Sequence, residues 1–263
     1  MFDELFEPLT KEELACYLKR LEISKAEKPT LSFLDQLIFA HQTHIVFEDL
    51  DAWLYHQSAG LGTKALYEKI ILNGRGGYCF ELNALFHHLL IALGYEATAC
   101  MCRILEDSMA ERNQISHRAE IVTLEGRSYF CDVGFGGPMP AGALELIENS
   151  WQIHKGQSFC IQSHDQNWKT LRRKTAKGET EDILQFTLMA QSPVDFVPLH
   201  EYFSKDPSSD FVRYPYLNIR TKDGSKSIAG NIFSIHEKGS HQKQILQSEE
   251  ELFSVIHSHF HLT

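Results

Sequence analysis

The chain has 263 residues, of which 43% are hydrophobic and 23% are charged, and it includes 16 glycines. This is the composition of an ordinary globular enzyme with a sizeable core in roughly one to three domains. The formal net charge of −10 argues against a general nucleic-acid binder, which needs a basic face. No apolar run approaches the ~18 residues of a membrane span, and the acidic start MFDELFEPLTKEE is unlike a signal peptide. We therefore expect a soluble, cytoplasmic protein without nucleic-acid or membrane partners.

Residues 1 to about 95 have the pattern of a helical region. Apolar residues recur at three- and four-residue spacing in three segments, at residues 11–23, 31–45 and 64–74. Thr10 and Glu13 form a capping-box pattern at the start of the first segment. Asn73 and Gly74 are a natural stop for the third.

From Tyr95 the pattern changes to the period of two that is typical of strands. Strands are expected over residues 96–105, in two runs within 117–135, and onward to about residue 190. Turn-rich stretches follow, and SEEELFSVIHSHF at the end is typical of an amphipathic helix. The sequence thus predicts a helical part over 1–95, an antiparallel β part over 96–190 and a mixed part over 191–263.

The segment GRGGYCFELN places three glycines and an arginine before Cys79. From Leu82 to Leu93 the apolar residues follow a complete helical stripe, so a helix is expected to begin at or just after Cys79. The unpaired N–H groups and the dipole at a helix start favour a thiolate. Gly76 and Gly77 are expected to permit a sharp turn and leave room for a substrate carbonyl. A buried structural cysteine is the alternative, but the helix start, the glycines and Arg75 together favour a nucleophile.

A thiolate nucleophile works with a histidine base and a third group that orients the base. If Glu125 and Gly126 form a two-residue hairpin turn, Ala119 lies opposite Asp132. His117 shares a face with Ala119 because side chains alternate along a strand. His117 and Asp132 are then diagonal neighbours, ~7–8 Å apart at the backbone. A three-residue turn would instead place them on opposite faces.

These motifs resemble a known family. RGGYCFELN followed by SHRAEIVTLEGRSYFCDVGFG is similar to the arylamine N-acetyltransferases, whose signature joins an RGGxCxExN segment to a histidine strand and a DxGFG segment. HIVFEDLD (44–51) resembles the family's PFENLD stretch, and YFSKDPSSDF (202–211) resembles its segment with a proline and serines. Val46 and Asp49 stand where the family usually has proline and asparagine. The resemblance covers nearly the whole chain.

The resemblance implies an α+β fold with a cysteine-protease-like Cys-His-Asp core. A helical bundle (1–95) would carry the nucleophile, an antiparallel β-barrel (96–190) would carry His117 and Asp132, and an α/β lid (191–263) would complete the fold. It also implies a ping-pong reaction with acetyl-CoA as co-substrate and a small arylamine, N-hydroxyarylamine or hydrazine as acceptor. Cys79 would take the acetyl group, His117 would hold the thiolate and then manage the amine proton, and Asp132 would fix the imidazole.

The resemblance also suggests binding residues. Phe135 looks like the family's aromatic residue that lines the acceptor pocket, and Phe47 would contribute similarly. Gly136 and Gly137 in FGGPMP resemble the loop near which the family seats the coenzyme's pyrophosphate, which exposed backbone N–H groups make physically reasonable. From the helix position we interpret Glu81, Asn83 and Arg75 as structural partners.

Several alternatives stay open at this point. A related acyltransferase or amide synthase with another acyl donor would use the same three residues. A papain- or transglutaminase-like hydrolase would use the same chemistry, and a binding protein that has lost activity is a fourth interpretation.

The histidines of HQTH (41–44) and HSHFH (257–261) lack a third ligand nearby, so no metal is expected. The six cysteines show no framework spacing, so we expect reduced thiols, in a monomer or a weak homodimer. Their positions are Cys16, Cys79, Cys100, Cys102, Cys131 and Cys160.

Overall fold

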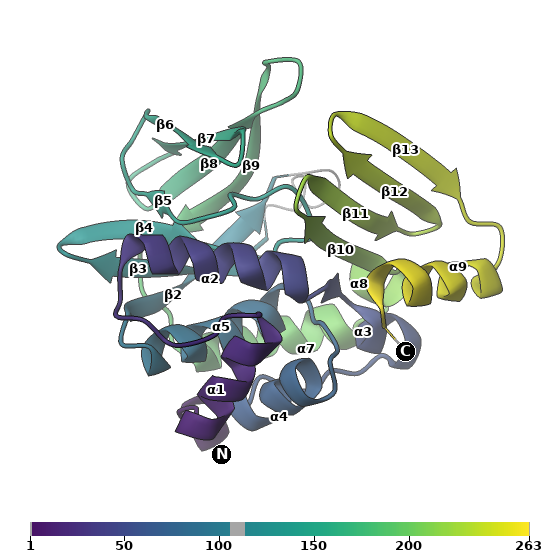
Figure 1. Cartoon of the computed structure of the whole chain (residues 1–263), viewed down its shortest axis with the longest axis horizontal. Helices are drawn as coiled ribbons and strands as arrows, with labels where there is room; N and C mark the ends of the chain where they lie inside the picture. Colours follow the sequence, from purple (N-terminus) through teal and green to yellow (C-terminus); the bar gives the residue numbers. More distant parts are fainter. Residues whose placement is uncertain (1, 106–113, 263) are drawn as a thin grey trace.

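The computed structural model describes residues 2–105 and 114–262. Helices make up one side of the molecule, and two antiparallel sheets stand over them (Figure 1). The helical elements of the first third are η1 (Asp3–Leu5), α1 (Lys11–Arg20), α2 (Leu31–His44), α3 (Leu50–Tyr55), α4 (Thr63–Tyr67), η2 (Glu68–Leu72) and α5 (Cys79–Ala92).

Local sequence signals set the ends of these helices. Thr10 Oγ1 accepts a hydrogen bond from Glu13 N at 3.2 Å, and the Glu13 carboxylate accepts one from Thr10 N at 2.8 Å. The predicted capping box of α1 is therefore confirmed. The helix formed by α4 and η2 ends at Asn73, where Gly74 takes a φ of +67° that other residues rarely adopt.

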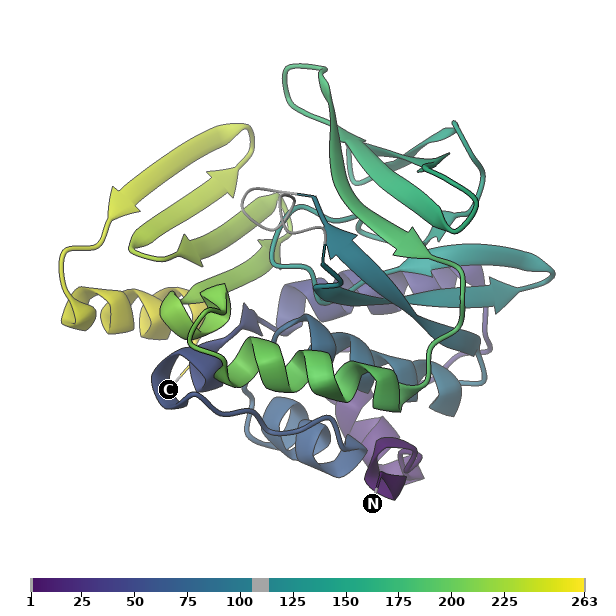
Figure 2. The same cartoon turned by 180° about the vertical axis from the view of Figure 1, so that it is seen from behind.

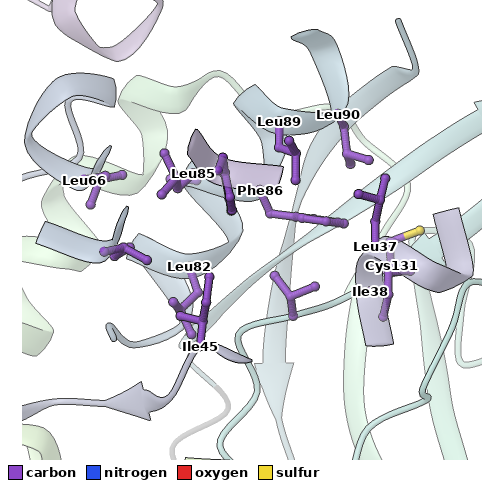
Figure 3. Packing of buried hydrophobic residues seen from close by; sticks show 14 of the residues in the cluster. Leu37, Ile38, Ile45, Leu66, Leu82, Leu85, Phe86, Leu89, Leu90 and Cys131 are labelled. Atoms are coloured by element: carbon purple, nitrogen blue, oxygen red, sulfur yellow. The ribbon is translucent and has the colours of Figure 1, made fainter. Parts of the chain in front are cut away.

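Helix α5 lies at the centre of the helical side and is buried on almost every face. Leu82, Leu85, Phe86, Leu89 and Leu90 are all completely buried. They belong to one hydrophobic cluster with residues of α2, α4 and several strands, and Figure 3 labels Leu37, Ile38, Leu66 and Cys131 among them. Each such side chain contributes about 1.5–3 kcal/mol when it is buried. The N-terminus of α5 is thus held in place by the main core.

The larger sheet has eight strands in the order β5-β4-β3-β2-β9-β8-β7-β6. They are β2 (Glu96–Ile104), β3 (His117–Leu124), β4 (Arg127–Cys131), β5 (Leu144–Glu145), β6 (Trp151–His154), β7 (Gln157–Ser163), β8 (Trp168–Lys174) and β9 (Thr180–Thr187). A bridge links Glu148, which follows the end strand β5, to Ile161 of β7 near the other end of the sheet, so the sheet forms a nearly closed barrel.

The β3–β4 hairpin has the predicted register. Glu125 and Gly126 both have positive φ, at 52° and 76°, as a two-residue hairpin turn requires. Leu124 pairs with Arg127, and Glu120 pairs with Cys131. The start of β3 and the residue after β4 therefore meet at the same end of the barrel.

The smaller sheet has the order β1-β10-β11-β12-β13. Its strands are β1 (Phe47–Glu48), β10 (Tyr216–Thr221), β11 (Gly224–Ala229), β12 (Ile232–Glu237) and β13 (Ser240–Ile245). Strand β1 comes from the N-terminal third: Phe47 pairs with Asn218 on one side and bridges to Gly77 on the other. The helices α9 (Glu249–Val255) and η4 (Ile256–Phe260) contribute to the hydrophobic cluster of this sheet.

After the barrel, the chain returns to the helical side before it forms the smaller sheet. The elements of this segment are η3 (Pro193–Phe196), α7 (Val197–Lys205) and α8 (Asp210–Arg213). In the view from behind, α7 lies across the helical side (Figure 2). Phe196, Phe203 and Phe211 join the same hydrophobic cluster as α5. The rings of Phe203 and Phe80 stack with centroids 5.7 Å apart, so α7 covers the first turn of α5.

The observed elements follow the predicted helical, β and mixed order, and the division at residues 95 and 190 into folding units stays a prediction. The turn-rich stretch before the last helix contains four strands that the periodicity did not indicate. One of them, β13, is exposed along its whole length, so it has no apolar alternation to detect. Within residues 2–105 and 114–262, no helix has both the length and the apolar character needed to span a bilayer.

Candidate active site

Cys79 is the first residue of α5, as predicted. Tyr78 precedes it in an extended conformation, with φ −102° and ψ −176°, and the Glu81 carboxylate accepts a hydrogen bond from Tyr78 N at 3.2 Å. Only 2% of Cys79 is exposed. The sulfur is therefore placed at the start of a buried helix, where the helix dipole favours a thiolate.

The structure corrects the expected role of Gly76 and Gly77. Neither glycine has positive φ. A Cβ atom at Gly76 would lie 2.0 Å from the Val46 carbonyl oxygen, and one at Gly77 would lie 2.7 Å from a carboxylate oxygen of Glu81. These two positions are therefore glycine because other protein atoms lie against them, and the glycines do not leave room for a substrate carbonyl. Because they have no side chains, the segment before Cys79 packs directly against β1 and α5.

A buried network of ion pairs holds the same segment before Cys79 in place. Arg75 donates to the Glu48 carboxylate at 3.0 and 3.1 Å and to Asp51 at 2.9 Å. Lys69 donates to both oxygens of Glu81 at 2.9 Å and pairs with Asp51 at 2.8 Å. The interpretation of Arg75 and Glu81 as structural partners is confirmed.

His117 and Asp132 meet as the hairpin register predicts. His117 is the first residue of β3, Asp132 follows β4 directly, and His117 Nε2 lies 2.5 Å from Asp132 Oδ2. Only 1% of His117 and 3% of Asp132 are exposed. Burial alone would lower the pKa of His117, but the Asp132 carboxylate, and then Cys79, raise it to about 10. The imidazole is therefore a cation at neutral pH.

Asn83 holds the other oxygen of Asp132. Its Nδ2 donates to Asp132 Oδ1 at 3.0 Å and to the Arg118 carbonyl at 2.6 Å, and its Oδ1 accepts from Val133 N at 3.1 Å. Gly134 N also donates to Asp132 Oδ1, at 2.8 Å. The interpretation of Asn83 as a structural tie from the helix start to neighbouring segments is confirmed.

The sulfur of Cys79 lies beside this pair. Cys79 Sγ is 3.8 Å from the carbonyl oxygen of Ser116, which directly precedes His117. Cys79 also acts on the pKa of the His117 ring, as a neighbouring group does. Because Nε2 is bound to Asp132, Nδ1 is the ring nitrogen left for the sulfur. The structure therefore brings Cys79, His117 and Asp132 together in one buried site, which suits a thiolate–imidazolium pair.

Phe135 and Phe47 both lie at this site. The ring of Phe135 meets that of His117 edge-on, with centroids 5.6 Å apart. A Cβ atom at Gly136 would lie 2.8 Å from the Phe47 ring, and one at Gly137 would lie 2.7 Å from the Phe135 ring. Gly136 is exposed and Gly137 is partly exposed. The two glycines therefore let the loop pass close over both aromatic rings while its backbone faces outward.

Two residues that the sequence did not single out hold this loop. Gln42 Nε2, from α2, donates to the carbonyls of Asp132 and Pro140 at 3.0 and 2.9 Å. Arg220, from β10, donates to the carbonyl of Met139. Both partners are backbone atoms distant in the chain, and no local motif could have indicated them.

The remaining cysteines and histidines have other surroundings. All six cysteines fall in the described part of the chain and are free thiols, as expected. Cys100 and Cys102 are buried in the barrel core. His87 Nδ1 is 2.8 Å from Glu120, and His41 Nε2 is 2.9 Å from the Tyr17 hydroxyl. Over residues 2–105 and 114–262, no group of three or more histidine, cysteine or acidic side chains is arranged to hold a metal.

Comparison with known proteins agrees with this architecture. Residues 30–263 match the model of an N-acetyltransferase family. The arylamine N-acetyltransferase of Mycobacterium bovis is 28% identical over 235 residues, which are 88% of this chain and 82% of the relative. The chain belongs to the arylamine N-acetyltransferase family, and both the predicted resemblance and the predicted fold class are confirmed.

Solved structures show the same likeness. The M. smegmatis arylamine N-acetyltransferase matches with a TM-score of 0.89 and 26% identity over 95% of this chain and 92% of that chain. The Mycobacterium marinum arylamine N-acetyltransferase in complex with CoA matches with a TM-score of 0.88 and 26% identity over 94% and 92% of the two chains.

Proposed function

We propose that this protein transfers an acetyl group from acetyl-CoA to an arylamine or hydrazine, through a thioester on Cys79. The observation that carries the proposal is the buried contact of His117 with Asp132 beside the Cys79 sulfur. Family membership supports the reaction class, and the CoA complex of the M. marinum relative supports the donor.

In the first half-reaction, the Cys79 thiolate attacks the thioester carbon of acetyl-CoA. A new bond forms between that carbon and Cys79 Sγ, and the bond from the carbon to the coenzyme sulfur breaks. The protonated His117 gives its proton to the departing coenzyme thiolate and becomes neutral. Free coenzyme A and acetyl-Cys79 are the products.

In the second half-reaction, an amine nitrogen attacks the carbonyl carbon of acetyl-Cys79. An aromatic amine is neutral near pH 7, so its lone pair is available. The neutral His117 takes the proton that the nitrogen loses, while the bond between the carbon and Cys79 Sγ breaks. The thiolate–imidazolium pair is restored, and Asp132 stabilises the charge on the imidazole in both halves.

The loop after Asp132 would bind both substrates. Phe135, against the His117 ring, would give the acceptor an aromatic wall close to the reacting carbon. Phe47 would line the same wall from β1. Gly136 and Gly137 expose backbone N–H groups where the coenzyme's pyrophosphate would sit.

Mass spectrometry of the intact protein tests the proposal. Incubation with acetyl-CoA should add one acetyl group, located on the Cys79 peptide, and an arylamine or hydrazine should then remove it and appear as its acetylated product. Cys79→Ser should carry no thioester, while Cys16→Ser, which alters an exposed thiol, should be acetylated like the wild type. No adduct and no acetylated amine would mean that this activity is wrong.

A panel of donors separates the proposal from its alternatives. Faster loading of Cys79 by another acyl thioester would favour a related acyltransferase or amide synthase. Cleavage of peptides or glutamine amides without coenzyme A would favour a cysteine hydrolase. Both outcomes keep the same three residues, so only the substrates decide.

A further inference from the structure

Arg220 is a cation that has no matching acid among the described residues. It lies on β10, partly buried, and its guanidinium donates to the carbonyl of Met139 in the loop after Asp132. Burial lowers its pKa to about 10. Among the residues that the structure describes, no carboxylate forms an ion pair with it. Removing a charge from water without a partner is costly, so a partly buried lone arginine is unusual as a purely structural feature.

The position of Arg220 relates it to the candidate active site. Side chains alternate along a strand, so Asn218 and Arg220 share one face of β10. Asn218 pairs with Phe47, and Phe47 borders Gly136. Arg220 is two strand residues, about 7 Å, farther along the same face. The loop beside Cys79, then Phe47 and then Arg220 thus follow one another along this face.

The surroundings of Arg220 suit an anion. Asp35 is a carboxylate that shares the neighbour His154 with Arg220, and it accepts a hydrogen bond from Ala143 N at 2.8 Å. After burial, Asp35 and Arg220 are the groups that act on the pKa of His154, in opposite directions. For Arg220 itself, burial is the cause of the lowered pKa. The guanidinium therefore keeps a positive charge that a ligand can neutralise.

We propose that Arg220 binds a phosphate group of the acetyl donor, an inference that rests on the function proposed above. One N–H of the guanidinium holds the Met139 carbonyl, which orients the group. Its other N–H groups have no partner within residues 2–105 and 114–262, so they can donate to phosphate oxygens. A planar guanidinium matches phosphate with paired, charge-assisted hydrogen bonds. Arg220 would thereby distinguish a phosphorylated donor from one that carries only the thioester and its pantetheine arm.

The test compares two donors on the same protein. Acetyl-CoA carries phosphates, and S-acetylpantetheine has the same thioester and arm without them. The rate at which Cys79 gains an acetyl group is measured by mass spectrometry over a range of donor concentrations. Arg220→Gln keeps a donor for the Met139 carbonyl but removes the charge. Arg220→Lys keeps the charge without the planar fork. Arg172→Gln, at a strand pair with Asp182, is the matched loss of one arginine elsewhere.

For Arg220→Gln we expect the acetyl-CoA concentration at half-maximal rate to rise about 10- to 100-fold, the size of a lost charged hydrogen bond. The value for S-acetylpantetheine should stay within about twofold, since that donor offers no phosphate. Arg220→Lys should fall between wild type and Arg220→Gln, and Arg172→Gln should match wild type.

Two results would overturn the inference while the proposed function stands. An equal loss with both donors would show that Arg220 acts only by holding the loop. An unchanged response to acetyl-CoA would show that it does not meet the phosphate. A wild-type protein that neither donor acetylates would instead overturn the proposed function, and the inference with it.

Discussion

Asn83 Nδ2 donates a hydrogen bond of 3.0 Å to Asp132 Oδ1, while His117 occupies the other oxygen of the same carboxylate. Asn83 is four residues after Cys79, so the two side chains lie on the same face of α5. One turn of helix therefore connects the sulfur to the group that orients the imidazole. The helix fixes both ends of the site at once.

Replacing Asn83 with Ala should lower both activity and stability. The change removes the acceptor of the buried Val133 N, which costs about 1–3 kcal/mol, and one donor to the Arg118 carbonyl. The acetylation rate of Cys79 should fall roughly 10- to 100-fold, because Asp132 loses one of the donors that hold it. Urea unfolding and single-turnover acetylation measure the two effects. A normal rate in a destabilised variant would show that Asn83 supports only the fold.

The pH dependence of Cys79 alkylation should report the charge on His117. With its pKa at about 10, His117 stays protonated across neutral pH and can pair with a thiolate at Cys79. The rate with iodoacetamide should therefore be nearly flat from about pH 6 to about pH 9. In Asp132→Asn the imidazole loses its negative partner, so the rate at pH 6 should fall steeply, and acetyl transfer should drop by roughly 10³–10⁴. A wild-type rate that rises tenfold per pH unit from pH 6 to 8 would contradict the ion pair.

The raised pKa of His117 also predicts how the free energy of unfolding changes with pH. The pKa of His117 is higher in the folded state, about 10, than its ordinary value of 6.5. The folded state thus binds the proton more tightly, and this stabilisation is complete below pH 6.5 and lost as pH rises toward 10. The free energy of unfolding of the wild type should exceed that of Asp132→Asn by more at pH 6.5 than at pH 10. Denaturant titrations at both values check the sign, and an equal difference would contradict it.

Two neighbouring glycines should respond very differently to alanine. At Gly76 the new Cβ would lie 2.0 Å from the Val46 carbonyl oxygen, so the backbone between β1 and α5 must move. At Gly74 the space is open, and only the φ of +67° is unfavourable. We expect Gly76→Ala to lose about 3 kcal/mol or more and Gly74→Ala about 1–2 kcal/mol. Thermal and urea unfolding measure both, and equal losses would show that the clash at Gly76 relaxes easily.

Asp49 offers a stabilising substitution. It is 2% exposed, its Oδ1 accepts from Tyr216 N at 2.9 Å, and its Oδ2 has no hydrogen-bond partner in the described part of the chain. Burial, and to a lesser extent Glu48, raises the pKa of Asp49 well above 3.8. The folded state therefore keeps a proton that the unfolded state loses, and stability falls as pH rises above about 3.9.

Asp49→Asn should raise the free energy of unfolding at pH 7 and flatten its dependence on pH, because the amide is neutral and can still accept from Tyr216 N. Asparagine is also the residue that the family usually has at this position. Urea unfolding at pH 5 and pH 8 measures the change, with Asp223→Asn, a more exposed acid, as the control. A loss of stability at pH 8 would contradict a protonated Asp49.

The parts of the site that the sequence predicted depend on local chemistry. The turn at Glu125 and Gly126 determines the hairpin register, and this register brings His117 and Asp132 together. The helical stripe after Cys79 indicates where α5 begins. Each of these signals lies within about 20 residues of the group that it places, so pattern and turn geometry are sufficient.

The parts that could not be predicted depend on contacts between distant segments. Gln42 and Arg220 reach the loop after Asp132 from α2 and β10, and nothing in their own neighbourhood specifies those partners. The role of Gly76 could not be predicted for the same reason, since the atom that excludes a side chain there belongs to Val46. Close packing of one backbone on another leaves no periodic pattern in the sequence.

Strand β1 makes the order of synthesis relevant to this protein. Phe47 and Glu48 pair with β10, and the same short strand bridges to Gly77 just before the nucleophile. The ribosome releases Cys79 long before it releases residue 216. A nascent or truncated chain that stops earlier has the thiol but lacks the strand that anchors the approach to it. The site around Cys79 would then be completed only when the last fifth of the polypeptide is synthesised. This delay would protect the growing chain from premature acylation.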